Sequence, residues 1–159
     1  MTRATKKPRA TSASCAVVVL DAVWLEALPG AERLVRRAAR AAVTGARRGG
    51  RKSLTVALAD DKRVRVLNAR DRKKNKPTNV LSYPSGEPGF LGDVVLARQT
   101  VWREARVQHK TPADHVSHLV VHGTLHLLGY DHETGNADAE RMEALERRIL
   151  KRLGIADPY

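Results

Sequence analysis

Apolar residues recur along this chain at two spacings, one typical of strands and the other typical of helices. The run from Cys15 to Leu20 is apolar and rich in β-branched residues, which predicts a buried strand. After Pro29, a helical spacing of apolar residues predicts a helix from Ala31 to about Ala46. Residues 53–58 then alternate between apolar and polar or small side chains, which predicts a half-buried strand.

The second half of the chain continues this alternation and ends in helices. A short helix is predicted to begin at Asp60 or Asp61, since either aspartate can cap it, and to end near Asn68. The later predicted elements are two strands joined by a turn, a helix, a helix capped by Thr111 and a final helix, at residues 80–83, 91–97, 102–107, 111–128 and 137–152.

These elements predict a single α+β domain in residues 14–159. We expect a small mixed sheet of about four strands with helices packed against it, although the order of the strands does not follow from the sequence. The 159 residues are enough for one domain with a substantial core. Residues 1–13 hold four basic side chains and no acidic one, and we expect a disordered basic tail there.

The chain carries a large excess of positive charge. Its formal net charge is +12, from 29 Lys and Arg against 17 Asp and Glu. This charge favours a polyanionic partner, and nucleic acid is the leading candidate. Four arginines share one side of the helix predicted after Pro29 and form a basic stripe: Arg33, Arg36, Arg37 and Arg40. The single Cys15 allows no intramolecular disulfide and fits a reducing compartment, so we expect a cytoplasmic protein with no membrane partner.

Residues 122–132 contain three histidines within eleven positions. His122 and His126 are four apart, so a helix places both imidazoles on one face, one turn from each other. Gly129 can adopt the left-handed conformation that ends a helix, which lets His132 approach the same point from the following turn. Three imidazoles with an open fourth position are typical of a catalytic zinc site. We therefore predict that His122, His126 and His132 hold a metal on a buried helix and the turn after it.

The residues beside these histidines indicate which reactions a metal site here could catalyse. In the zinc-peptidase signature H-E-x-x-H the second residue is the general base, and here that position is Gly123. This glycine argues against a zinc hydrolase that acts on peptides or small amides. His118 lies one turn before His122, and we interpret it as a hydrogen-bonded core histidine or a support for the ligands.

The segment from His122 to His132 resembles the signature of the YbeY endoribonucleases, which are bacterial factors of ribosomal RNA maturation. The resemblance covers roughly Cys15 to Tyr159 and includes residues 67–68, 72, 77–82, 91–93 and 142–146. It implies that His122, His126 and His132 bind one Zn²⁺ ion and that Arg72 is a functional arginine. It also implies a single-stranded ribosomal RNA precursor as substrate, and the small ribosomal subunit or its assembly proteins as partners.

The expected activity is that of a zinc-dependent endoribonuclease acting in ribosomal RNA processing and ribosome maturation. A metal-activated water or hydroxide would drive phosphodiester cleavage, either by attacking phosphorus or by acting as a base toward the adjacent 2′-hydroxyl. Negative charge then builds on the phosphoryl oxygens, and we expect Arg72 to meet it with two parallel donors. The alternative is a non-catalytic, zinc-stabilised RNA-binding assembly factor, which would unfold when the metal is removed.

Overall fold

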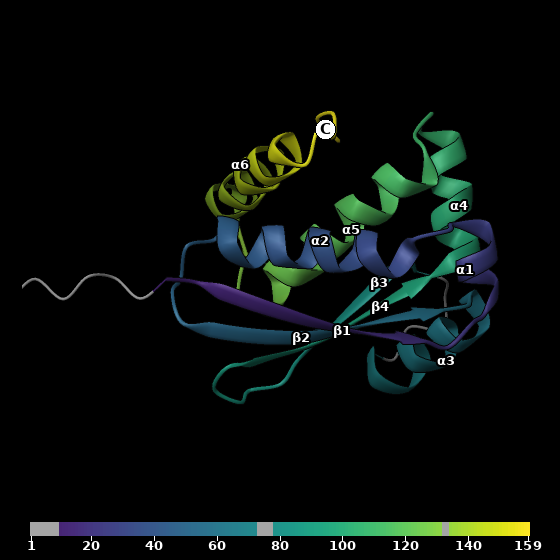
Figure 1. Cartoon of the computed structure of the whole chain (residues 1–159), viewed down its shortest axis with the longest axis horizontal. Helices are drawn as coiled ribbons and strands as arrows, with labels where there is room; N and C mark the ends of the chain where they lie inside the picture. Colours follow the sequence, from purple (N-terminus) through teal and green to yellow (C-terminus); the bar gives the residue numbers. More distant parts are fainter. Residues whose placement is uncertain (1–9, 73–77, 132–133) are drawn as a thin grey trace, which may run out of the picture.

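The fold of the computed structural model is built on a four-stranded sheet (Figure 1). The structure describes residues 10–72, 78–131 and 134–159. The strands are β1 (Ser12–Val19), β2 (Arg51–Ala59), β3 (Val80–Pro84) and β4 (Phe90–Ala97), in the order β1-β2-β4-β3. The strands β1, β2 and β4 run parallel, and β3 pairs antiparallel with β4 as a hairpin. The predicted α+β fold with a mixed sheet of about four strands is confirmed.

Helices cover both faces of this sheet. They are α1 (Val23–Ala27), α2 (Ala31–Gly45), α3 (Asp61–Arg72), α4 (Arg98–Val107), α5 (Pro112–Leu127) and α6 (Asn136–Arg152). The helices α2, α5 and α6 lie on one side of the sheet and α3 on the other (Figure 1). Each side has its own cluster of buried apolar side chains, and the larger cluster lies beneath α2, α5 and α6. Within the described ranges, none of the helices is both long and apolar enough to cross a membrane.

The strand β2 is buried on both faces, so the prediction of a half-buried strand is wrong. Leu54, Val56 and Leu58 belong to the larger core, whereas Ala57 and Ala59 belong to the smaller core that also contains Val64 of α3. The small residues at two of these positions give the sequence an alternating pattern although both faces are covered. Strands in the interior of a parallel arrangement are typically covered on both sides in this way.

Two predicted boundaries shift in the structure. The Asp60 carboxylate accepts a hydrogen bond from the backbone N–H of Arg63 at 2.8 Å, so Asp60 caps α3. The helix continues four residues beyond the predicted end and includes Arg72, because neither glycine nor proline interrupts the chain before Pro77. The strand β1 begins at Ser12, inside the segment predicted as a basic tail, and residues 1–9 of that segment lie outside the described residues.

The helix α5 lies at the centre of the fold. The Thr111 hydroxyl accepts a hydrogen bond from the backbone N–H of Asp114 at 3.1 Å, and Pro112 occupies the first turn, as the sequence predicts. Ten of the sixteen residues of α5 are buried, and the helix packs against α2, α4, α6, β3 and β4. The core therefore holds this helix in place from several sides.

Candidate metal centre

The C-terminal half of α5 brings two imidazoles together. His122 and His126 lie one turn apart, with their ring centroids 4.6 Å apart and their Nε2 atoms 3.0 Å apart. Both side chains are only partly buried, whereas the helix around them is mostly buried. Two ring nitrogens thus face one another at a point on α5 that solvent can reach.

A buried carboxylate on α6 contacts the other side of His122. Glu146 has no exposed surface, and its Oε1 atom lies 2.6 Å from Nδ1 of His122. Its Oε2 atom lies 3.1 Å from Nε2 of His118 and accepts a hydrogen bond from the Tyr159 hydroxyl at 2.5 Å. The carboxylate therefore has three partners, which is what a buried charge requires to be tolerated.

These contacts determine the charge of Glu146 and the proton position on His122. Burial alone raises the pKa of Glu146, but hydrogen bonds from His118, His122 and Tyr159 outweigh it and lower the pKa to about 2. Burial and the contact with Glu146 raise the pKa of the Tyr159 phenol well above its usual range. An ionised carboxylate only accepts hydrogen bonds, so His122 donates from Nδ1, and in its neutral form this imidazole has its lone pair on Nε2. That lone pair faces His126.

The described residues include a cluster that is able to hold a metal ion. Ligand atoms of His118, His122 and Glu146 all lie within 4.8 Å of one another. Two arrangements are possible on these side chains: a cation between His118, His122 and Glu146, or a cation on the opposite nitrogen of His122, together with His126.

The interatomic distances favour the second arrangement. Zinc binds imidazole at about 2.0–2.1 Å, so two nitrogens on one tetrahedral ion are separated by about 3.3–3.4 Å. The Nε2 atoms of His122 and His126 are within hydrogen-bond distance at 3.0 Å, only a few tenths of an ångström short of that separation, whereas the 2.6 Å hydrogen bond between His122 and Glu146 is much shorter than it. A carboxylate that holds the far nitrogen of a ligating histidine is a common feature of zinc sites.

The turn after α5 has the conformation expected of Gly129. The helix ends at Leu127, and Gly129 has a φ of +96°, in the left-handed region. The backbone N–H of Tyr130 donates to the Leu125 carbonyl at 3.0 Å, so the chain turns back toward the helix. His132, the third predicted ligand, lies outside the described residues. The structure thus places two of the three predicted ligands side by side, and the role of His132 stays a prediction.

A chain of hydrogen bonds links Arg72 to the same helix. Nη2 of Arg72 donates to the backbone carbonyl of Ser82 at 2.6 Å, and the Ser82 hydroxyl donates to the carbonyl of Gly123 at 3.1 Å. The guanidinium also lies 5.7 Å from the ring centroid of Tyr83, whose hydroxyl donates to Asp71 at 3.1 Å. The end of α3 is therefore attached to β3, and β3 to the backbone beside His122.

Gly123 faces the sheet, where a side chain has no space. A Cβ atom at this position would lie 2.9 Å from Cγ1 of Val94 and 3.2 Å from Oγ of Ser82. The glycine allows α5 to approach β3 and β4 closely. A glutamate, the general base of zinc peptidases, does not fit at this position, which agrees with the argument against peptide hydrolysis.

Sequence reasoning assigned no role to three residues of this site: Ser82 and Glu146, which lie in segments that the family resemblance includes, and Tyr159. Ser82 and Tyr159 carry no local signal, because only tertiary packing brings them to α5. Glu146 does carry one, since a carboxylate stands next to Leu145 in the stripe of apolar residues that α6 buries. His118 is hydrogen-bonded to Glu146, in line with its interpretation as a core or supporting histidine.

We expect Glu146→Gln to weaken zinc binding about 10- to 100-fold, the range typical of groups that orient metal ligands. The amide keeps the volume of the carboxylate but lacks its charge, so it cannot accept three hydrogen bonds with the same strength. Competition with a chromogenic chelator measures the zinc affinity, and Glu140→Gln, an exposed acid on the same helix, is the control. Equal affinities in the two variants would contradict the role assigned to Glu146.

Comparison of the sequence with known proteins identifies one family that the chain matches. A family model described as "Endoribonuclease YbeY" matches residues 27–154. A protein named Endoribonuclease YbeY from Azorhizobium caulinodans is 52% identical over 151 residues, covering 90% of this chain and 94% of its own length. Proteins of the same name from Novosphingobium aromaticivorans and Gluconobacter oxydans are 46% and 44% identical, covering 88% and 96% of this chain and 92% of their own length.

A solved structure shares the fold. The solution structure of TM1509 from Thermotoga maritima covers 91% of this chain and 98% of its own chain, with a TM-score of 0.55. Its sequence identity is 22%, so this likeness concerns only the fold.

Proposed function

This chain belongs to the YbeY endoribonuclease family, and from that premise we propose that it is a zinc-dependent endoribonuclease specific for single-stranded RNA. Membership rests on a family match across most of the chain and on relatives that are about half identical to it. An endoribonuclease of this family cuts within an RNA chain, and ribosomal RNA processing is the role that we assign to it.

The observation that supports a metal-dependent reaction is the arrangement of His122 between Glu146 and His126. Glu146 holds a proton of His122 on Nδ1, so the nitrogen that the neutral imidazole offers to a metal is Nε2, which faces His126 at 3.0 Å. We assign His122, His126 and His132 as the zinc ligands. A zinc ion held by three neutral imidazoles supplies a Lewis acid that activates water near neutral pH.

Arg72 supplies the second positive group of the proposed site. Its Nη2 atom is occupied by the Ser82 carbonyl, while Nε and Nη1 form no hydrogen bond with any residue in the described ranges. Nη2 carries a second N–H, which lies parallel to an N–H of Nε or Nη1, so the guanidinium can still donate two parallel hydrogen bonds to the oxygens of a scissile phosphate, where negative charge grows during cleavage. The contact with Ser82 holds the guanidinium in place before the substrate arrives, and we assign Arg72 as a catalytic residue.

The charge of the chain supports a long RNA substrate. A formal net charge of +12 attracts a polyanion, and RNA is the polyanion that an endoribonuclease cuts. We propose a single-stranded ribosomal RNA precursor as the substrate and the cytoplasm as the location. The small ribosomal subunit or its assembly proteins are the partners that we propose.

A direct test uses purified protein, a labelled single-stranded RNA, the same RNA as a duplex, and casein. We expect about one zinc per chain, cleavage of the single strand, slower cleavage of the duplex and no cleavage of casein. Chelation should stop cleavage, added zinc should restore it, and the circular dichroism of the metal-free protein should stay that of a folded chain. Zinc-loaded protein that binds the RNA without cutting it, and that unfolds on chelation, would support the non-catalytic assembly factor instead.

A further inference from the structure

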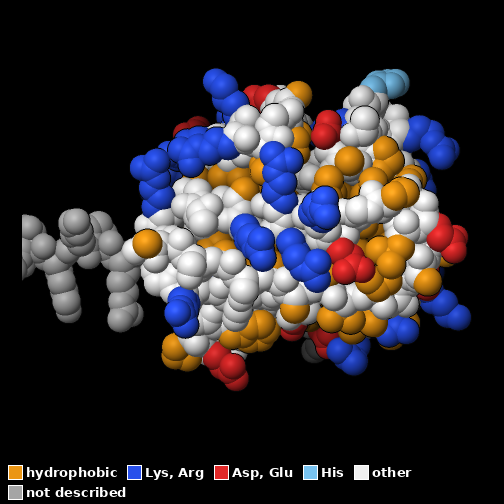
Figure 2. Space-filling view, in the orientation of Figure 1, with side chains coloured by type: hydrophobic (Ala, Val, Ile, Leu, Met, Phe, Trp, Pro, Cys, Tyr) orange, Lys and Arg blue, Asp and Glu red, His pale blue; other side chains and the backbone are white. Residues whose placement is uncertain are grey.

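The outer face of α2 carries a row of exposed arginines. Arg33, Arg37 and Arg40 are separated by four and three residues, so they project from the same side of the helix, and all three are exposed. Lys and Arg side chains lie across the part of the molecular surface where α2 runs (Figure 2). We call Arg33, Arg37 and Arg40 the α2 row.

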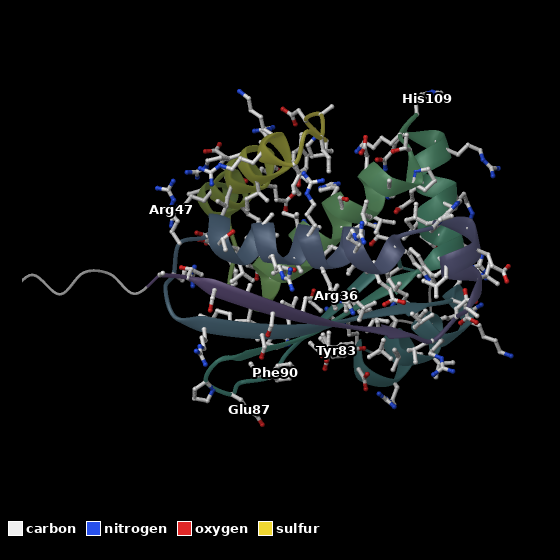
Figure 3. All side chains as sticks on the ribbon, viewed as in Figure 1. Arg36, Arg47, Tyr83, Glu87, Phe90 and His109 are labelled. Carbon is white, nitrogen blue, oxygen red and sulfur yellow. The ribbon has the colours of Figure 1, made fainter. Side chains whose placement is uncertain are left out.

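Arg36, which the sequence places in the same basic stripe, has a different role. Its Nε atom donates to the backbone carbonyl of Cys15 at 3.2 Å, and its Nη2 atom lies 3.7 Å from Glu32. Figure 3 shows this side chain turned from α2 toward β1. Arg36 therefore helps to hold α2 on the sheet and does not belong to the α2 row.

The α2 row has no acidic partner within the described part of the chain. On α6, by contrast, Arg141 pairs with Asp138 at 3.8 Å and Arg147 with Asp157 at 3.1 Å. Like charges four residues apart on a helix are slightly destabilising. Among residues 10–72, 78–131 and 134–159, the three guanidinium groups of the α2 row thus form no ion pair, and they are available to an external anion.

The positive surface continues from the end of α2 toward the metal centre. Arg47 and Arg48 follow α2, both are exposed, and Figure 3 shows Arg47 at the end of the helix, pointing away from the sheet. The guanidinium carbon of Arg48 lies 4.6 Å from the ring centroid of Tyr130. Tyr130 follows Gly129 in the turn that leads to His132, so the basic surface reaches the segment that holds the third predicted ligand.

The composition of α2 identifies the kind of anion. A helix that binds a membrane surface exposes large apolar side chains beside its basic ones, but α2 contributes none of the exposed large apolar residues, and its apolar side is buried in the core. Arginine binds phosphate through two parallel donors. The row rises along the helix in steps of about 6 and 4.5 Å, which suits the close succession of phosphates along a nucleic-acid backbone.

We propose that the α2 row, together with Arg47 and Arg48, is a docking surface for the phosphate backbone of RNA outside the cleavage site. It would hold a structured part of the substrate while an adjoining single strand passes Tyr130 to the metal centre. This inference rests on the proposed function for its choice of RNA, and it adds a second binding surface to that function.

The test compares two variants that each lose three positive charges. Arg33→Gln, Arg37→Gln and Arg40→Gln together remove the α2 row, whereas Lys62→Gln, Arg63→Gln and Arg106→Gln together remove three exposed charges from α3 and α4. Fluorescence anisotropy measures the binding of an RNA stem-loop with a single-stranded extension over a series of salt concentrations. A second assay measures the cleavage of a short single strand that cannot reach from α2 to the metal centre.

Only the first variant is expected to lose affinity for the stem-loop, by about 10- to 100-fold near 0.15 M salt, and its logarithmic salt slope should fall by about 2 to 3. Both variants should keep their zinc and cut the short strand at the wild-type rate, within about twofold. Equal binding losses in the two variants, or none in the first, would overturn the proposal. Binding to phosphatidylglycerol vesicles is measured for the same proteins. A first variant that lost affinity for the vesicles but not for the stem-loop would also overturn the proposal. Stem-loop binding that depends on α2 in a protein that never cuts RNA would refute the proposed nuclease but support this surface.

Discussion

Replacing His126 by glutamine is expected to remove the bound zinc and to reduce RNA cleavage to background, whereas His118→Gln is expected to retain both. The two histidines lie on α5, one turn on either side of His122, so the substitutions are closely matched. His126 faces the Nε2 lone pair of His122, while His118 donates to Glu146, a role that a glutamine amide can partly replace. Zinc per chain, measured by atomic emission, and initial rates on single-stranded RNA check this prediction.

The reverse result would have a specific meaning. Zinc lost in His118→Gln and kept in His126→Gln would place the ion between His118, His122 and Glu146, which is the other arrangement that these side chains allow. Thermal unfolding of both variants shows whether a loss of zinc comes from a missing ligand or from a destabilised core. Both variants should unfold cooperatively, because the buried apolar residues of α5 are the same in both.

Replacing Arg72 by alanine is expected to lower the cleavage rate by about 10²- to 10³-fold while the zinc content stays unchanged. That range is typical when one donor to a developing negative charge is removed. Arg72 is exposed, and its one side-chain hydrogen bond within the described ranges goes to the Ser82 carbonyl, so the loss of stability should be small. Single-turnover rates at saturating RNA, with zinc quantified in the same samples, separate a slower chemical step from weaker binding.

Two further variants define what Arg72 does. Arg70→Ala removes a neighbouring guanidinium that pairs with Asp71 at 2.8 Å, and its rate should stay near that of the wild type. Arg72→Lys keeps the positive charge but loses the two parallel donors, so its rate should fall between those of the wild type and of Arg72→Ala. A wild-type rate in Arg72→Lys would exclude a role that depends on the guanidinium fork.

Local signals in the sequence account for most of the secondary structure. The Thr111 cap, the periodicity of α2 and the turn between β3 and β4 depend on nearby residues, and each appears in the structure where it is predicted. The order of the strands and the double-sided burial of β2 depend on contacts between distant segments. Ala57 and Ala59 show why the burial of β2 is hard to predict, since alanine is compatible with both an exposed and a buried position and here is buried in the smaller core.

The candidate site divides in the same way. The spacing of His122 and His126 is a property of one helix, so it could be predicted without a fold. Glu146 reaches His122 only because α6 packs on α5, and Ser82 reaches Gly123 only because β3 lies under it. The sequence therefore indicates the ligands, whereas the groups that orient them appear only in three dimensions.

The position of β3 at the edge of the sheet gives Arg72 a second consequence. The Asn79 carbonyl accepts from Ala97 of β4 at 2.9 Å, so alternate carbonyls of β3, including that of Ser82, point away from the sheet. Such exposed groups invite strand addition by another molecule and hence aggregation. Arg72 covers the carbonyl of Ser82, and Pro84 ends the strand after five residues. Arg72 would then have two tasks, protecting the edge of the sheet from aggregation and contacting the substrate. A substitution that affects one of these tasks would therefore affect the other as well.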